Sequence, residues 1–185
     1  MDAPSRRSTD VTSTLTLPLT ATRSHPVLDF DTLYRAARDD VYAYVATLLG
    51  DRSAAEDVTA SAFERAFLKQ GTYKPARGTE RAWLFGIARN AALDELRRRK
   101  RAATAEMPPP PQDPSPDEAA QLAAERDAVR RALGGLPARD RELIALKYHA
   151  DLSNAEIAEV LGVNANHAGT LLHRAMTKLR EAVDA

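Results

Sequence analysis

The chain has 185 residues, 44% of them hydrophobic and 28% charged, with 11 prolines and a formal net charge of zero, which favours one or two small modules joined by extended segments. The absence of cysteine excludes a disulfide framework and a thiolate metal site, and it suits a reducing cytoplasm. No apolar run approaches the roughly 20 residues of a membrane helix, so we expect a cytoplasmic protein with no membrane insertion.

The N-terminal segment, residues 1–26, is rich in Ser and Thr and contains three prolines. Such a composition cannot bury enough apolar surface to offset the entropy of ordering. We therefore expect a disordered tail. The alternation of Leu15, Leu17 and Leu19 gives weak support to a strand that pairs with a partner.

Two helices are predicted next. From Phe30 onward, apolar residues recur at helical intervals, and Gly50 supplies a stop. The positions of this first stripe are Leu33, Ala37, Val41, Val45 and Leu48.

A second helix follows Asp51, with Ser53 as the expected N-cap and Glu56 completing a capping box. Its expected apolar positions are Val58, Ala62, Phe63, Ala66 and Phe67. Two explanations account equally well for the acidic residues Glu56 and Asp57. They stabilise the positive N-terminal end of the helix dipole, or they contact a partner.

The segment GTYKPARG, residues 71–78, interrupts this periodicity with two glycines and a proline. It carries one aromatic side chain, Tyr73, and two cations, Lys74 and Arg77. Aromatic rings stack on unpaired bases and cations follow the phosphate backbone. A loop of this composition is therefore a candidate site for single-stranded nucleic acid.

The sequence RAWLFGIARNAALDELRRRKR, residues 81–101, predicts a helix with two different faces. The apolar face is expected to contain Trp83, Leu84, Ile87, Ala88 and Ala91. The opposite face is expected to contain Arg89, Asn90, Asp94 and Arg97. The helix ends in the consecutive cations Arg97, Arg98, Arg99, Lys100 and Arg101. This cluster indicates a polyanionic partner, although a solvated helix end would have the same composition.

Four consecutive prolines, Pro108 to Pro111, lie in a segment that we expect to be a Pro-rich linker, residues 102–116. This linker would tether one module, residues 27–101, to another, residues 117–185. A helix is predicted from about Asp117 to the stop at Gly134 and Gly135.

The second module predicts a helix-turn-helix. Pro137 opens one helix, which ends near His149, and Ser153 with Glu156 forms a capping box for a short helix, residues 154–161. Gly162 then makes a turn, and Asn164 caps a helix that reaches about residue 183. The buried stripe of this last helix is expected to be Ala168, Leu172, Ala175 and Leu179. The residues expected to face outward are His167, Thr170, Leu171, Arg174 and Lys178. A helical hairpin of this kind can also be a simple packing unit.

These motifs define an all-α fold of two small helical domains joined by a Pro-rich linker. In order and spacing they resemble the extracytoplasmic-function (ECF) sigma factors of bacterial RNA polymerase. The resemblance rests on AEDVTASAFERAF, on RAWLFGIARNAALDELRRR, and on LPARDRELIALKYHADLSNAEIAEVLGV with LLHRAMTKLRE. It implies that residues 27–101 are sigma domain 2 and that residues 117–185 are sigma domain 4.

The resemblance also implies partners and site residues. The partners would be core RNA polymerase, promoter DNA and an anti-sigma factor, with no small-molecule substrate, cofactor or metal. The residues implied for polymerase binding are Glu56, Asp57, Phe63 and Arg65. Those implied for minus-10 recognition and melting are Tyr73, Lys74, Arg77, Arg89, Asn90, Asp94, Arg97, Arg98, Arg99, Lys100 and Arg101. Those implied for minus-35 recognition are Asn164, Asn166, His167, Thr170, Leu171, Arg174 and Lys178.

Two departures from the family pattern affect these expectations. Many members have a Gln-Glu pair where this chain has Ala60 and Ser61, and basic residues often stand at the positions of Gly169 and Leu171. The main alternative is a stand-alone helix-turn-helix regulator, which would bind promoter DNA tightly without polymerase. An enzyme is disfavoured because the four histidines are dispersed and show no metal-site spacing.

Overall fold

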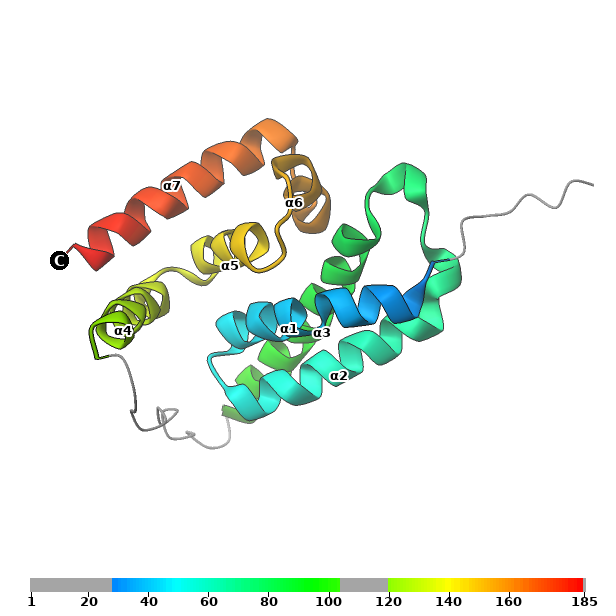
Figure 1. Cartoon of the computed structure of the whole chain (residues 1–185), viewed down its shortest axis with the longest axis horizontal. Helices are drawn as coiled ribbons and strands as arrows, with labels where there is room; N and C mark the ends of the chain where they lie inside the picture. The colour runs from blue at the N-terminus through cyan, green and yellow to red at the C-terminus, as the bar shows by residue number, and fades with distance from the viewer. Residues whose placement is uncertain (1–27, 104–119, 185) are drawn as a thin grey trace, which may run out of the picture.

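A computed structural model describes residues 28–103 and 120–184. Over these two ranges the chain is all α-helical apart from two 3₁₀ turns and the connecting segments (Figure 1). The predicted tail and most of the predicted linker lie outside the described residues. Within them, no helix is both long and apolar enough to cross a membrane.

The first module consists of three helices, α1 (Phe30–Leu49), α2 (Arg52–Lys69) and α3 (Glu80–Ala103). The predicted stop at Gly50 is confirmed, because this residue adopts the left-handed conformation with φ 63°. The predicted cap at Ser53 is wrong. Asp51 is the N-cap of α2, since its extended backbone lets its carboxylate accept a hydrogen bond from the Ala54 amide.

The core of the first module is formed where α3 packs against both α1 and α2. Tyr44 and Phe85 are fully buried there, with ring centroids 5.4 Å apart in an edge-to-face arrangement. All five predicted apolar positions of α1 are buried. On α2 the inward position predicted for Phe67 is wrong, because the ring is 53% exposed at the edge of the module, 5.3 Å from Phe30.

The second module contains α4 (Ala120–Gly135), α5 (Ala138–Tyr148), α6 (Asn154–Leu161) and α7 (Ala165–Val183). The predicted capping box of α6 is confirmed. Gly162, at φ 67°, makes the turn between α6 and α7, and the Asn164 side chain caps α7 by accepting from the Asn166 amide. These local signals together form the predicted helix-turn-helix.

The two modules pack directly against each other, with α5 on α1 and α6 on α3 (Figure 1). One continuous core joins Leu84 and Phe85 of the first module to Leu146 and Ile157 of the second. The sequence of α5 explains why the modules are in contact, because the four residues from Leu143 to Leu146 are all buried. Four consecutive buried residues cover more than one face of a helix, so α5 contacts both α7 and α1. The prediction of two modules tethered only by a linker did not include this contact.

Candidate nucleic-acid interface

The loop predicted to hold bases is compact in the structure. It contains two 3₁₀ turns, η1 (Gln70–Thr72) and η2 (Pro75–Arg77). The Tyr73 ring lies against Trp83 with centroids 5.8 Å apart, and its hydroxyl donates a hydrogen bond to the Gly78 carbonyl at 3.3 Å. Tyr73 is therefore held in place from one side while part of its ring remains exposed.

A groove of about 570 Å³ lies between this loop, the first half of α3, and α6. Four predicted minus-10 residues line it, namely Tyr73, Lys74, Arg77 and Asn90. Trp83 and Ile87 also line the groove, although the sequence pattern assigned both to the buried face of α3. Both are only half-buried, so the apolar stripe of α3 extends past the core into the groove.

Other predicted minus-10 residues point elsewhere. Arg89 was expected beside Asn90, but its Nε donates to Glu142 of α5 at 2.6 Å, and only 24% of its side chain is exposed. Asp94 forms ion pairs with Arg65 of α2 and with Arg97, each at 3.1 Å. The structure thus separates Arg89 and Asp94 from the groove that Asn90 lines.

The cationic end of α3 is partly neutralised by carboxylates. Arg98 and Arg99 bind Glu95 at 2.7 and 2.8 Å, and Arg99 also binds Asp51 at 2.8 Å. The hydrogen bond from Arg98, together with that from Arg99, lowers the pKa of Glu95 below its usual value. Arg97 and Arg98 keep 69% of their side chains exposed, so this helix end still presents positive charge to solvent.

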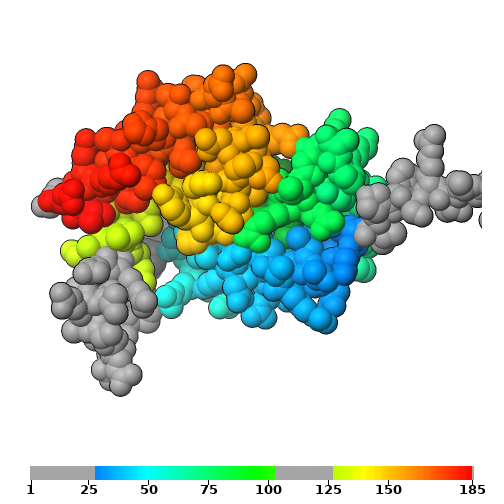
Figure 2. All heavy atoms as spheres, turned by 45° about the horizontal axis from the view of Figure 1, so that its top comes forward, coloured from blue at the N-terminus to red at the C-terminus, as the bar shows by residue number. Residues whose placement is uncertain are grey.

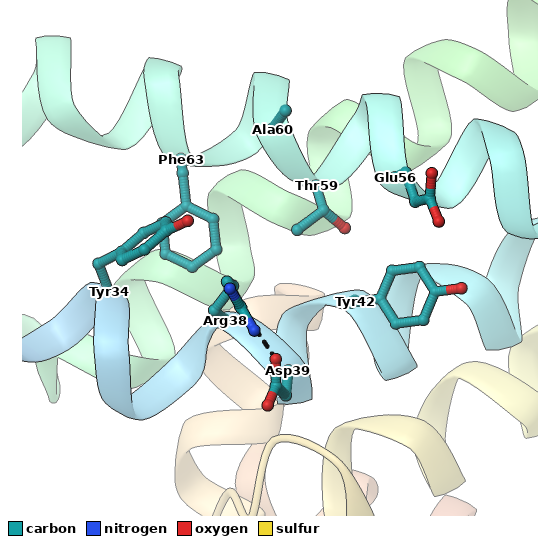
Figure 3. Close-up of a pocket in the computed structure, with 8 residues that line it drawn as sticks. All are labelled: Tyr34, Arg38, Asp39, Tyr42, Glu56, Thr59, Ala60 and Phe63. Atoms are coloured by element: carbon teal, nitrogen blue, oxygen red, sulfur yellow. Dashed lines mark hydrogen bonds and ion pairs between the residues drawn. The ribbon is translucent and has the colours of Figure 1, made fainter.

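A second groove, of about 590 Å³, lies between α1 and α2 (Figure 3). Two of the predicted polymerase-binding residues, Glu56 and Phe63, line it. Figure 3 shows the rings of Tyr34 and Phe63 on one side of Thr59 and that of Tyr42 on the other. The Thr59 hydroxyl is buried and has no hydrogen-bond partner. An unpaired buried hydroxyl in an aromatic groove favours a ligand that brings its own polar atom.

The other two predicted polymerase-binding residues lie outside this groove. Asp57 is exposed on α2. Arg65 is directed toward α3, where it binds Asp94. The structure therefore groups Glu56 with Phe63 and does not bring Arg65 into the same site.

The helix-turn-helix presents most of its predicted residues at the surface. The exposed ones are Asn164, Asn166, His167, Thr170, Arg174 and Lys178. The outward position predicted for Leu171 is wrong, because this side chain is half-buried against the shared core. Lys178 lies further along α7, where its ammonium group binds Asp140 at 2.5 Å.

An aromatic and cationic groove beside a helix-turn-helix is an arrangement typical of nucleic-acid-binding proteins. The family models describe the two parts as Sigma-70 region 2, over residues 33–102, and Sigma-70, region 4, over residues 126–179. Relatives named ECF RNA polymerase sigma factors match across both parts. The chain belongs to the ECF sigma factor family.

Two relatives and one solved structure illustrate the range of sequence identity and coverage. BldN of Streptomyces coelicolor is 35% identical over 158 residues, which cover 81% of this chain and 58% of BldN. SigK of Mycobacterium sp. strain KMS is 30% identical over 159 residues, which cover 83% of this chain and 82% of SigK. The sigma factor RpoE, solved in complex with the anti-sigma factor NepR from Bartonella quintana, superposes with a TM-score of 0.73 at 23% identity. That superposition covers 85% of this chain and 98% of RpoE and shows the shared fold.

Proposed function

We propose that this family member binds core RNA polymerase and directs promoter-specific transcription initiation, reading minus-35 and minus-10 elements and helping to melt the promoter. The observation that carries this proposal is the groove where Tyr73, Lys74, Arg77 and Asn90 converge beside Trp83. The alternative, a stand-alone regulator, would leave this groove without a role.

In the minus-10 step, the groove would accept bases from the melted strand. The half-exposed rings of Tyr73 and Trp83 offer stacking surfaces, and stacking contributes about 1–3 kcal/mol per base. Lys74 and Arg77 would contact the phosphates, while the Asn90 amide can donate to and accept from a base edge. The chain would perform no bond chemistry, because the catalytic site belongs to the polymerase.

In the polymerase-binding step, the groove between α1 and α2 would receive core polymerase. Its aromatic lining and the Glu56 carboxylate in its wall suit a basic segment with an apolar stem, and the exposed Asp57 carboxylate outside the groove adds negative charge to the same helix. Such a segment could also supply the polar atom that the Thr59 hydroxyl lacks. Arg65, already bound to Asp94, would orient the α2 and α3 surfaces rather than contact the partner.

In the minus-35 step, α7 would enter the major groove with its N-terminal residues, as recognition helices do. Arg174, Thr170 and His167 are exposed along one side of this helix, and Asn164 and Asn166 lie at its start. Lys178, held by Asp140, would contribute at most a phosphate contact.

We further propose that an anti-sigma factor restrains this chain in a bacterial cytoplasm. The support is that RpoE, a protein of the same fold, was solved with the anti-sigma factor NepR. Co-purification of the tagged chain from its host, followed by identification of bound proteins, tests this part of the proposal.

The central experiment is transcription with purified core polymerase on genomic DNA fragments. We expect specific transcripts that require the chain, and we expect Tyr73→Ala with Asn90→Ala to reduce them. Gel shifts without polymerase supply the control, since few cations lie on the exposed face of α7 and free-protein binding should be weak with a shallow salt dependence. Tight specific binding at physiological salt without polymerase would favour the regulator instead.

A further inference from the structure

One face of α7 carries three exposed side chains at intervals of about one helical turn. Asn166, Thr170 and Arg174 are spaced by four residues, and all three are exposed. Four residues advance a helix by about 6 Å and by slightly more than one turn, so these side chains form one exposed α7 stripe. Figure 2 shows α7, coloured orange to red, along an outer edge of the molecule, opposite the blue helix α1. The stripe is therefore open to a large partner.

The first member of the stripe, Asn166, offers a complete amide group. Two asparagines lie at the start of α7, but the Oδ1 atom of Asn164 already accepts a hydrogen bond from the Asn166 backbone amide at 2.9 Å, as the N-cap of the helix. The side chain of Asn166 makes no hydrogen bond to any residue that the structure describes. Its carbonyl oxygen and its NH₂ group are both available, and this pair matches N6 and N7 of adenine in the major groove.

The second member, Thr170, offers a methyl group rather than a hydroxyl group. Its hydroxyl donates a hydrogen bond to the carbonyl of Asn166, one turn earlier in the same helix, at 3.1 Å. The only proton of this hydroxyl is therefore used inside α7. The methyl group is left to make contacts at this exposed position, and a threonine methyl group can pack against the C5 methyl group of thymine.

The third member, Arg174, offers an unpaired guanidinium group. Lys178 follows one turn later, but its ammonium group is bound to Asp140. Arg174 has no ion pair and no hydrogen bond with any side chain that the structure describes. The fork of a free guanidinium group matches O6 and N7 of guanine, and this pairing is the commonest base-specific contact in the major groove.

We propose that the exposed α7 stripe reads an adenine through Asn166, a thymine through Thr170 and a guanine through Arg174 in the upstream promoter element. This inference rests on the proposed function and specifies the bases that the recognition helix selects. The stripe is about 12 Å long at 1.5 Å per residue, and base pairs stack about 3.4 Å apart. The three bases should therefore lie within about four consecutive base pairs.

The test uses the full chain bound to core polymerase, on a promoter that transcription of genomic fragments has identified. Base analogues are placed one at a time in the upstream element, on either strand. Replacing thymine by uracil removes only the C5 methyl group, whereas 7-deazaadenine and 7-deazaguanine each lack the N7 acceptor. Competition against the unmodified duplex measures how much each analogue weakens binding.

We expect one uracil to weaken binding about fourfold, which is the contribution of one buried methyl group. One 7-deazaadenine and one 7-deazaguanine should weaken binding about tenfold each. Thr170→Ser should bind the unmodified duplex about fourfold more weakly and show no uracil effect, because the methyl group is gone. Thr170→Val keeps a methyl group and should retain the uracil effect. Asn166→Ala should show no effect of 7-deazaadenine, and Arg174→Ala should show none of 7-deazaguanine.

Thr177→Ser is the matched control. The Thr177 hydroxyl donates to the His173 carbonyl at 3.1 Å in the same manner, and this exposed residue lies beyond the end of the stripe. The control should leave the uracil effect unchanged. An effect that survives the loss of its assigned side chain, or analogues that weaken binding nowhere in the element, would overturn the proposed readout. A complete lack of polymerase-dependent transcripts would instead overturn the proposed function, and the readout with it.

Discussion

Arg89 and Asn90 are neighbours in the chain, yet they face different surroundings on α3. Arg89 reaches Glu142 in the interface between the modules, whereas Asn90 lines the groove beside Trp83. Successive residues of a helix are rotated by about 100°, which is enough to direct one side chain into the second module and the next into the groove. A single turn of α3 therefore contributes both to module packing and to the proposed site.

Asn90→Ala should impair promoter melting while leaving upstream contacts intact. The reason is that Asn90 lines the groove that we propose reads the minus-10 element, and it does not lie on the recognition helix. Permanganate footprinting with core polymerase measures the unpaired thymines directly. Normal melting combined with lost upstream protection would contradict the assignment.

Arg174→Ala should show the reverse pattern. Arg174 is exposed on α7, and a bidentate arginine contact to a base contributes about 1–3 kcal/mol of discrimination. Upstream protection should therefore weaken, and binding to core polymerase should be unchanged. A polymerase pull-down with the variant serves as the control, and loss of polymerase binding there would argue against a DNA-reading role.

Glu95 predicts an acid-sensitive contribution to stability. Its pKa is lowered from 4.5, chiefly by the hydrogen bond from Arg98. The stabilisation is therefore fully present above pH 4.5 and is lost as the pH falls through the lowered folded-state pKa. In thermal melts, Glu95→Gln should be less stable than the unmodified chain at pH 7 and should lose less stability on acidification. An identical loss in both proteins would show that Glu95 contributes nothing.

At the scale of single elements, α7 contains an unusual glycine. Gly169 lies beside α6, and a Cβ added to it would be 3.2 Å from the Nδ2 atom of Asn154. Asn154 is exposed on the first turn of α6, so its amide can rotate away. The close approach is to the end of an exposed side chain rather than to backbone.

Gly169→Ala should therefore stabilise the second module. Alanine is better than glycine in a helix interior by up to about 1 kcal/mol, and the contact with Asn154 should cost only part of that gain. Chemical denaturation measures the difference, and the double change with Asn154→Ala should recover the full propensity gain. Destabilisation that persists in the double variant would mean that the backbone of α6 limits the space.

Element boundaries were predictable from sequence where the signal is local. The caps at Ser153 and Asn164 and the turn at Gly162 each depend on side chains within a few residues. The cap at Ser53 failed because Asp51, two residues earlier, offers a stronger acceptor that Arg99 also binds. Aspartate and serine are both favourable N-cap residues, and Arg99 of the distant helix α3 holds the Asp51 carboxylate at this helix end.

The candidate site was also predictable only in part, because some of its residues are positioned by contacts with distant helices. Tyr73, Lys74 and Arg77 share one short loop, so their grouping follows from the sequence. The position of Arg89 does not, because its partner Glu142 is 53 residues away. Helical periodicity indicates which residues share a face, but it does not indicate which of several neighbouring helices that face contacts.

At the scale of the whole molecule, the linker connects two modules that touch. The four prolines at 108–111 lie outside the described residues, between the end of α3 and the start of α4. Because the modules meet through α1, α3, α5 and α6, their contact does not depend on contacts made by the linker itself. The linker should therefore set how far the modules separate once the polymerase holds them on one promoter.

Replacing Pro108 to Pro111 with Gly and Ser should preserve both folds and reduce promoter activity modestly, because a flexible spacer samples a wider range of separations. Circular dichroism and transcription on the same promoter measure the two effects. Unfolding of either module would show that the proline segment belongs to a domain rather than to a linker.

Trp83 is the only tryptophan in the chain, and it lies against Tyr73 in the wall of the groove between the 70–78 loop, α3 and α6. Selective excitation of indole therefore reports on this one location, without any attached dye. A base stacked nearby would quench the emission. The protein thus contains its own optical probe, with which the binding of single-stranded DNA can be timed in stopped-flow mixing.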